Sequence, residues 1–342
     1  MTIVHCDASR AADWDRFIDA TPGGSFYHRF AWKGINETEF GHQSAYLAAM
    51  DGDRITGVLP LVRVDTRLFG NLACSLPFVN YGGPVTTDPD VERALFDEAS
   101  RVVADWGSKY LEVRARRPLA VSLPTSSHKV SLTVALDADP EVLFKRFKTG
   151  HRQEIRRAYK HGLTATQGGA ELLDPFYDVL TDSWRALGSP LYAKRYFKAI
   201  LDAFPSQVRI CVVHAHGEPA GAAFDGLHND TVEGMWLGLR PQYRRFLVGY
   251  VLYWELIQDA CRRGFTHFHL GRSTADSNAE TFKSKWNATT TPLYWSYVLR
   301  DGQAIPQLNV ANPKFRMAIA AWQEMPLVAT RILGPRIARG IP

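Results

Sequence analysis

One segment combines a cationic side chain with the end of an expected strand: HFHLGRSTADSNAETFKSKW. We expect the strand to end before Gly271 and the loop after it to carry Arg272 and Ser273. Ligand groups of α/β proteins usually lie at such strand ends. The helix that follows presents Phe282 and Lys283. An ammonium there is suited to stabilise a developing oxyanion or a departing oxygen; the alternative is an ordinary exposed helical lysine.

A cluster of basic residues lies in FKRFKTGHRQEIRRAYKHG, which has a single acidic residue, Glu154. Four of its cations have the helical spacing i, i+4, i+5 and i+8 and therefore share a face: Arg152, Arg156, Arg157 and Lys160. One-sided positive charge favours a phosphorylated or nucleic acid partner. A solvated helix face would give the same pattern and stays open as the alternative.

The elements that must position these residues occur twice along the chain. Each copy is expected to begin with two helices, at 11–20 and 30–40 in the first and at 174–187 and 193–203 in the second. In the first copy, three strands (SAYLAAM, ITGVLPLVRV and ACSLPFVNYGG), a helix at 89–106 and a strand (YLEVRA) follow. In the second, the corresponding elements are VRICVVHA, AGAAFDGLH, TVEGMWLGL, a helix at 247–263 and FTHFHLGR.

This order is that of an acyltransferase domain of the N-acetyltransferase (GNAT) type. The sequence therefore predicts an α/β (α+β) fold with two tandem GNAT-like domains, mixed central sheets and a cleft between the domains. Asp139 and Pro140 are a good N-cap and first helical residue, which places the join nearby. We expect domains at 1–136 and 137–300, followed by a basic amphipathic helical tail at 301–342.

The entry to the long helix of the second copy departs from the usual phosphate-binding pattern. Acetyl-CoA enzymes of this architecture have Arg/Gln-x-x-Gly-x-Gly/Ala there, because backbone amides at the helix start hold the pyrophosphate. Here the run extends from Arg244 to Gly249, with Leu247 in place of the first glycine. A leucine side chain restricts the backbone and crowds a phosphate. Because the first copy has no version of the pattern, ordinary CoA binding is disfavoured in both copies, most strongly in the first.

The tail is expected to form two short amphipathic helices, within NPKFRMAIAAWQEM and PLVATRILGPRIARG. Their polar positions are mostly basic: Lys314, Arg316, Arg331, Arg336 and Arg339. One interpretation is that the helices pack over the domains. The other is that residues 313–340 form an interfacial anchor on an anionic membrane.

Bulk properties narrow the class of protein. The chain has 342 residues, 46% of them hydrophobic and 22% charged, with a net charge of +5, as in a soluble two-domain protein. No apolar stretch approaches the ~20 residues that span a bilayer, and MTIVHCDASR does not resemble a signal peptide. The four cysteines are far apart in the sequence, as expected of buried thiols in a reducing compartment, so we expect a cytoplasmic protein.

Familiar catalytic and metal-binding sets are missing from the sequence. It has no G-x-S-x-G, H-E-x-x-H or P-loop motif. His214 with His216, and His267 with His269, could each form a pair on one side of a strand. Since no third ligand is in register with either pair, no metal site is predicted.

Four features together resemble the FemAB family, the aminoacyl-tRNA-dependent transferases that build peptidoglycan cross-bridges. They are HRQEIRRAYKHGLTA, the paired-unit order, LRPQYRRFLVGYVLYWELIQDACRRGF and LGRSTADSNAETFKSKW. SLPFVNYGGP and the tail are similar to the subgroup that accompanies exosortase and exopolysaccharide export systems. The likeness spans nearly the whole chain and implies a BioF2/FemAB-like acyltransferase domain in its second part.

The resemblance also assigns roles to single residues. The family's Phe-Lys pair falls on Phe282 and Lys283, and the lysine is implicated in catalysis. Cations that anchor the acceptor in the family correspond loosely to Lys33 and Arg195. Close relatives have an acidic residue before GRS where this chain has His269, which could act as a base near neutral pH. The long helical arm of some members is absent, so a tRNA donor is implied by the family alone.

The predicted function is transfer of an aminoacyl or acyl group to an amine of a cell-envelope precursor, lipid-linked or nucleotide-linked. The donor is an aminoacyl-tRNA or an acyl-CoA, used as co-substrate with no bound cofactor. Lys283 would stabilise the oxyanion, and the arginine face would bind phosphates. Two alternatives stay open: a CoA-dependent N-acyltransferase for an amino sugar of an exported polysaccharide, and a non-enzymatic partner of an envelope export assembly.

Overall fold

The computed structural model describes residues 1–66, 70–299, 303–306 and 313–341, with side chains from residue 316 onward in the last range. The chain forms two compact units, and each is described by itself. Unit 1 comprises residues 1–130, 291–307 and 339–342, and unit 2 comprises residues 131–290 and 308–338. The expected division at 1–136, 137–300 and 301–342 follows chain order, whereas both units collect segments that are far apart in sequence.

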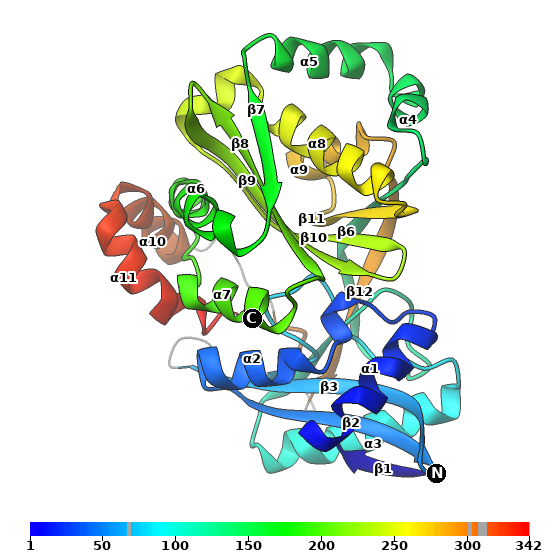
Figure 1. Ribbon diagram of the computed structural model, residues 1–342. Coiled ribbons are helices and arrows are strands. Elements are labelled where there is room, and N and C mark those ends of the chain that lie inside the picture. Colours follow the sequence, from blue (N-terminus) through cyan, green and yellow to red (C-terminus); the bar gives the residue numbers. More distant parts are fainter. Residues whose placement is uncertain (67–69, 300–302, 307–312, 342) are drawn as a thin grey trace. The chain divides into compact units, whose positions relative to one another are not determined.

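Unit 1 is built on a sheet with the strand order β1-β2-β3-β4-β5-β12, in which β4 and β5 are parallel (Figure 1). The apolar stripe of α3 (Pro89–Asp105) packs on β2 and β3, where Leu47, Leu59 and Leu95 are fully buried. The other elements of this unit are β1 (Thr2–His5), α1 (Ala11–Ala20), α2 (Ala31–Phe40), β2 (Gln43–Asp51), β3 (Arg54–Thr66), β4 (Gly70–Cys74) and β5 (Tyr110–Ala115).

Unit 2 repeats this plan with the order β6-β11-β10-β9-β8-β7, in which β10 and β11 are parallel. Its helices α6 and α8 cover opposite faces of the sheet (Figure 1). Phe224 of β9 contacts Phe176 of α6. Burial and then the charge of Asp225, the next residue of β9, raise the pKa of Tyr253 in α8 on the other face. Its elements are α4 (Pro140–Arg146), α5 (Thr149–Tyr159), β7 (Thr164–Gly168), α6 (Leu173–Ala186), α7 (Lys194–Ala203), β8 (Val208–Ala215), β9 (Glu218–His228), β10 (Thr231–Leu239), α8 (Val248–Arg262), β11 (His267–Thr274) and α9 (Asn278–Ser284).

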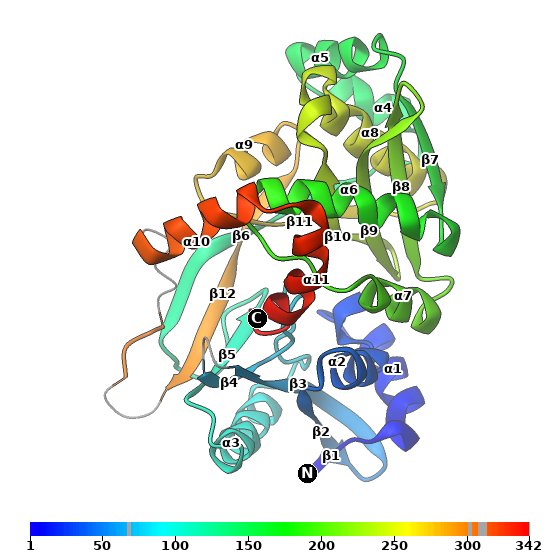
Figure 2. The same ribbon diagram turned by 90° about the vertical axis from the view of Figure 1, so that its left-hand side faces the viewer.

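The chain passes from one unit to the other within two strands. These are β6 (Thr125–Ala135), which crosses the boundary after Val130, and β12 (Thr289–Leu299), which crosses it after Thr290. Two helices complete unit 2: α10 (Pro313–Glu324) and α11 (Leu327–Ala338) pack against α6 (Figure 2). No helix in the described ranges is long and apolar enough to cross a bilayer.

The predicted α/β fold with a repeated helix-helix-strand-strand-strand-helix-strand order is confirmed, but two strand ends were wrong. The strand expected over ACSLPFVNYGG ends at Cys74, because Leu76 (φ 117°) and Phe78 (φ 70°) adopt conformations that a strand excludes. Gly271 does not end its strand. At φ 77° it is accommodated within β11, which continues to Thr274, so Arg272 and Ser273 lie on the strand.

A buried ion pair on β5 of unit 1 contacts two side chains of β12. The Arg114 side chain, 1% exposed, pairs with the Glu112 carboxylate at 2.6 Å, and its guanidinium lies 4.5 Å from the ring centroid of Trp295 in β12. Glu112 also accepts a hydrogen bond of 3.1 Å from the Tyr297 hydroxyl. Since a buried guanidinium is costly without a partner, the Glu112 carboxylate is what makes an arginine tolerable here.

We expect Glu112→Ala to destabilise the protein by about 3–5 kcal/mol, because it leaves the Arg114 charge buried and unpaired. Urea unfolding followed by tryptophan fluorescence measures the change. The control is Asp202→Ala, which breaks the exposed pair with Lys198 and should cost at most about 1 kcal/mol. Equal effects of the two substitutions would contradict the role given to Glu112.

Candidate functional site

Lys283 points its ammonium at the backbone of β11. It lies in the last turn of α9, a short helix whose N-cap, Ser277, accepts from the amide of Glu280. Its Nζ donates to the carbonyl oxygens of Gly271 at 3.1 Å and Arg272 at 2.9 Å. Burial and, to a lesser extent, the Arg272 charge lower the pKa of Lys283 to about 8. Lys283 is therefore a partly buried cation that can lose its proton near neutral pH.

Phe282 joins α9 to the start of α8 through an aromatic cluster. Its ring lies 5.2 Å from that of Tyr250, 5.5 Å from that of Tyr253 and 6.3 Å from that of Trp286. Gly249 is part of the same contact: a Cβ there would lie 3.2 Å from Leu239 Cδ1 and 3.8 Å from Phe282 Cζ. The structure thus brings the predicted residues Gly249, Phe282 and Lys283 together.

The start of α8 is not capped by a side chain. Leu247, the residue found where a glycine was expected, has φ 60° and ψ 33°, a left-handed conformation that glycine adopts more easily. The N-cap residue Leu247 offers the first amides of α8 no side-chain hydrogen bond. Arg244 and Arg245 lie exposed in the turn before it, which spans Pro241–Phe246. An uncapped helix start next to two cations can accept an anion.

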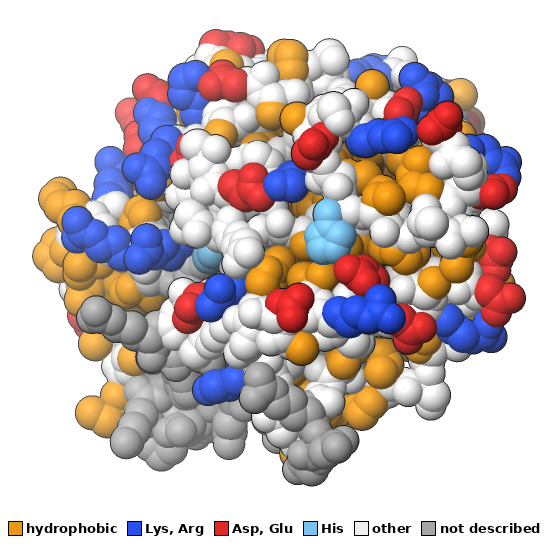
Figure 3. All heavy atoms as spheres, turned by 90° about the horizontal axis from the view of Figure 1, so that it is seen from below, with side chains coloured by type: hydrophobic (Ala, Val, Ile, Leu, Met, Phe, Trp, Pro, Cys, Tyr) orange, Lys and Arg blue, Asp and Glu red, His pale blue; other side chains and the backbone are white. Residues whose placement is uncertain are grey.

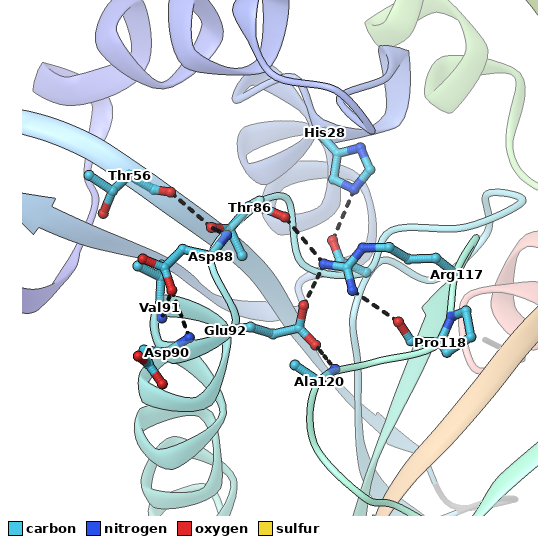
Figure 4. Close-up of polar contacts among 11 residues, drawn as sticks. His28, Thr56, Thr86, Asp88, Asp90, Val91, Glu92, Arg117, Pro118 and Ala120 are labelled. Atoms are coloured by element: carbon cyan, nitrogen blue, oxygen red, sulfur yellow. Dashed lines mark hydrogen bonds and ion pairs between the residues drawn. The ribbon is translucent and has the colours of Figure 1, made fainter.

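The corresponding helix start in unit 1 is occupied by the chain's own carboxylates (Figure 4). Asp88 accepts from the amides of Asp90 and Val91, and Glu92 pairs with Arg117. A cavity of about 470 Å³ adjoins this helix start, and Asp88, Glu92 and Arg117 are among its lining residues. The amides of Asp90 and Val91 and the Arg117 guanidinium therefore already have carboxylate partners within unit 1.

The predicted arginine face lies on α5, but its members differ in their contacts. The Arg152 side chain is held by neighbours in the chain: it donates to the carbonyl of Lys145 at 2.9 Å and to Thr149 Oγ1 at 3.1 Å. Arg156 stacks on the ring of Phe144, and Arg157 pairs with Glu154 at 2.9 Å. Both remain exposed, as does Lys160. The helix therefore presents exposed cations at Arg156, Arg157 and Lys160 rather than at Arg152.

Sequence reasoning missed His151, on the buried side of α5. Its ring lies 4.4 Å from that of Trp286 and 5.5 Å from that of Tyr250. Neither ring nitrogen of His151 nor the indole nitrogen of Trp286 has a hydrogen-bond partner among the described residues. Burial and the nearby charge of Lys285 lower the pKa of His151 to about 4. No sequence motif marks this residue, since its environment comes from α8 and α9.

His269 is the centre of a buried polar chain on three strands. Its Nε2 lies 2.6 Å from Ser131 Oγ in β6, and its Nδ1 lies 2.9 Å from Glu233 Oε2 in β10. All three side chains are almost fully buried. Ser131 and Glu233 were not anticipated, because 102 residues separate the two in sequence (233 − 131) and only strand pairing brings them beside His269.

The remaining predicted residues have simpler surroundings. Ser273 is buried in β11, and its hydroxyl has no hydrogen-bond partner among the described residues. Arg195 lies exposed on α7. Lys33 belongs to α2 of unit 1 and pairs with Glu37 at 2.5 Å. In the described part of the chain, no group of three or more His, Cys, Asp or Glu side chains could hold a metal ion.

We expect stability to fall as the pH is lowered from 6.5 towards 4, partly because of His151. Its pKa is about 4 in the folded protein and 6.5 in a free imidazole, so the unfolded chain binds the proton more readily in this range. His151→Phe should remove at least about 1 kcal/mol of this acid sensitivity, as judged by urea unfolding at pH 7 and pH 4.5. The control is His5→Gln, an exposed histidine. An unchanged pH dependence in His151→Phe would contradict the assignment.

Comparison with known proteins places this geometry in a known fold. Residues 145–284 match the acetyltransferase (GNAT) domain family. No curated protein gives a significant match. Among solved structures, FemX is similar with a TM-score of 0.65 at 13% identity, covering 86% of this chain and 97% of FemX.

Two further structures are similar at a lower level. The C-terminal domain of a putative lysylphosphatidylglycerol synthetase from Agrobacterium fabrum gives a TM-score of 0.55 at 14% identity, covering 85% of this chain and 92% of that one. A tandem GNAT protein from the clavulanic acid biosynthesis pathway gives 0.52 at 12% identity, covering 86% and 97%. With the matched family domain containing Lys283 and the start of α8, the chain is an acyltransferase of the GNAT fold.

Proposed function

We propose that this acyltransferase moves an aminoacyl or acyl group from an activated ester or thioester to an amine of a cell-envelope precursor. The observation that carries the proposal is the position of Lys283. Its ammonium is held by two carbonyl oxygens in the same aromatic cluster that contains the uncapped start of α8. A cation and an anion-accepting helix start within one cluster suit a donor whose phosphates lie near its reactive carbonyl.

The reaction needs an amine, a carbonyl and a place for negative charge. The amine lone pair attacks the donor carbonyl, the carbonyl oxygen becomes an oxyanion, and collapse breaks the bond to the leaving oxygen or sulfur. Lys283 stabilises the oxyanion or the leaving atom, because its charge acts in a partly buried and less polar environment. A pKa of about 8 leaves most of the side chain protonated at neutral pH and also able to pass a proton to the leaving atom.

The donor is bound through its phosphates at the start of α8. Support comes from the uncapped first turn and the exposed Arg244. The exposed Arg156 and Arg157 of α5 extend positive charge for the donor or for the acceptor, with Arg195 as a further acceptor contact. An aminoacyl-tRNA fits the resemblance to the FemAB family. An acyl-CoA is the second candidate, and the uncapped helix start of unit 2 favours it.

The acceptor is an amine of a lipid-linked or nucleotide-linked envelope precursor. Support comes from the FemAB resemblance and from the fold shared with a putative lysylphosphatidylglycerol synthetase. An amino sugar or a peptide of an exported polysaccharide or of peptidoglycan would provide such an amine. Such precursors would place the protein on the cytoplasmic side of the plasma membrane.

His269 is the base of the reaction in this proposal, and it acts through Ser131. Both ring nitrogens of His269 are engaged, Nδ1 by Glu233 and Nε2 by Ser131. Since Ser131 is itself almost fully buried, a water carries the amine's proton to Ser131 Oγ, which gives its own proton to Nε2. Glu233 then stabilises the imidazolium.

We expect Lys283→Ala to lower kcat by about 10²-fold or more, as loss of an oxyanion donor does. Purified protein is incubated with candidate amines and either acyl-CoA or aminoacyl-tRNA, and amide formation is followed by mass spectrometry. In the wild type, kcat should fall as the pH rises through about 8, since Lys283 loses its proton there, whereas Lys283→Arg should move this limb upward. Lys198→Ala, an exposed lysine of α7, is the control. Full turnover in Lys283→Ala would remove this residue from the mechanism.

We expect Ser131→Ala and His269→Ala to reduce kcat by similar factors, about 10²-fold, and the double variant to be no worse than either single one. The reason is that each substitution interrupts the same proton path. Ser108→Ala, which removes a buried hydroxyl bonded to Asn71, controls for the loss of a buried serine. Multiplicative effects in the double variant would show that the two residues act separately.

A further inference from the structure

The helices α10 and α11 concentrate the exposed apolar side chains of the described residues. Eight large hydrophobic side chains are exposed among all the described residues. Five of them belong to these two helices: Met317, Val328, Ile332, Leu333 and Ile337. Met317 is 73% exposed and Val328 is 71% exposed. Leu187, at the end of α6, is a sixth, next to Gly188, whose added Cβ would lie 2.4 Å from Ile319 of α10. We call these six residues the tail surface.

The inner faces of the two helices are already used by unit 2. Gln323 donates to the carbonyl of Ala186, and Arg185 donates to the carbonyls of Gln323 and Met325. Trp322 is buried, and Gly334 allows α11 to approach Leu191, whose carbonyl lies 3.0 Å from the Cβ that another residue would have. The helices are therefore docked on α6, and the exposure of the tail surface is not caused by missing packing on their inner side.

The outer face of α11 repeats with helical spacing. Thr330, Gly334 and Ala338 are buried at intervals of four residues. Val328, Ile332 and Arg336 have the same interval on the opposite side and are exposed. An apolar ladder that ends in a cation is the pattern of a helix lying in the interface of a bilayer, with its apolar side chains below the headgroups.

The net charge of the tail indicates which kind of surface would cover this face. From Pro313 to Pro342 the sequence has five basic residues and one acid, Glu324, a net charge of +4. The whole chain has +5, so the other residues together contribute only +1. On the face drawn in Figure 3, by contrast, acidic and basic side chains lie side by side. Of these five basic residues, Arg331 pairs with Asp178 and Arg339 belongs to unit 1. The charges of Arg316 and Arg336 beside the exposed apolar residues favour an anionic lipid surface.

We propose that the tail surface docks the protein on an anionic lipid bilayer, with Val328, Ile332 and Met317 inserted among the headgroups and Arg316 and Arg336 at the lipid phosphates. This goes beyond the proposed acyl transfer, because it requires no substrate and leaves the Lys283 site unoccupied. It would hold the enzyme where lipid-linked acceptors are.

The test is co-sedimentation of the full chain with vesicles of phosphatidylglycerol and phosphatidylcholine, compared with vesicles of phosphatidylcholine alone. We expect binding to the anionic vesicles that weakens as salt is raised. Removing both Arg316 and Arg336 (Arg316→Gln with Arg336→Gln) should reduce the partition coefficient by about 5-fold for each charge. Val328→Ser with Ile332→Ser should reduce it by about 10-fold or more, since each loses buried apolar area.

Matched controls separate docking from general effects. Val142→Ser removes an exposed valine of α4, and Arg262→Gln removes an exposed arginine of α8; both should bind like the wild type. Circular dichroism confirms that the variants fold. No binding to anionic vesicles, or equal binding by the Val328/Ile332 variant, would overturn the proposal. Concentration-dependent dimerisation that the same variant abolishes, without vesicle binding, would overturn it in favour of a protein interface. Neither outcome depends on acyl transfer, so the proposed function is tested separately.

Discussion

The contact between the Lys283 ammonium and the carbonyl oxygens of Gly271 and Arg272 determines how the candidate site is built. A partly buried cation must have acceptors, and α9 is too short to supply them at its own end. Gly271 meets this need by leaving regular strand geometry at φ 77° within a strand that nevertheless continues. The lysine is thereby fixed to β11, at a distance from bulk water that lowers its pKa to about 8.

The environment around this contact is aromatic and has few polar partners. Phe282, Tyr250, Tyr253 and Trp286 hold α9 against α8, and His151 attaches the basic helix α5 to the same cluster. These rings exclude water, and the His151 nitrogens and the Trp286 indole nitrogen have no hydrogen-bond partner among the described residues. The same physical property explains the low pKa of His151 and the strengthened field of the Lys283 charge. The apolar cluster is therefore part of the chemistry as well as of the core.

The two units share one plan but differ at the start of their long helices. In unit 1, Asp88 caps α3 and a glutamate–arginine pair adjoins it, so its positive end is neutralised. In unit 2, α8 begins after a left-handed Leu247, with no capping side chain and with two exposed arginines before it. A duplicated fold thus keeps the anion-accepting helix start in one copy only. The tail helices complete unit 2 and leave it an apolar outer face with positive charge.

The order of elements in both units could be predicted from sequence, because hydrophobic periodicity and turn residues are local signals. The same holds for Lys283 and Phe282, which a recognisable segment carries, and for the basic helix. The strands β1, β7 and β12 were not predicted. For β1 and β7 the reason is that single-sequence patterns of four or five residues are ambiguous, whereas β12 follows the second copy and pairs with β5 of the first. Leu76 and Phe78 look like strand residues in the sequence, and only their positive φ angles show that they are not.

Sequence by itself determined which side chains are available and along which element each one lies. Tertiary structure alone decided that Ser131, Glu233 and His269 lie together as one buried polar chain, and that His151 lies against Trp286. It also decided that Arg152 bonds to the Lys145 carbonyl and the Thr149 hydroxyl while Arg156 and Arg157 remain exposed. The physical reason is that partners across a sheet or between helices are set by strand pairing and packing, which bring together residues that no local pattern connects.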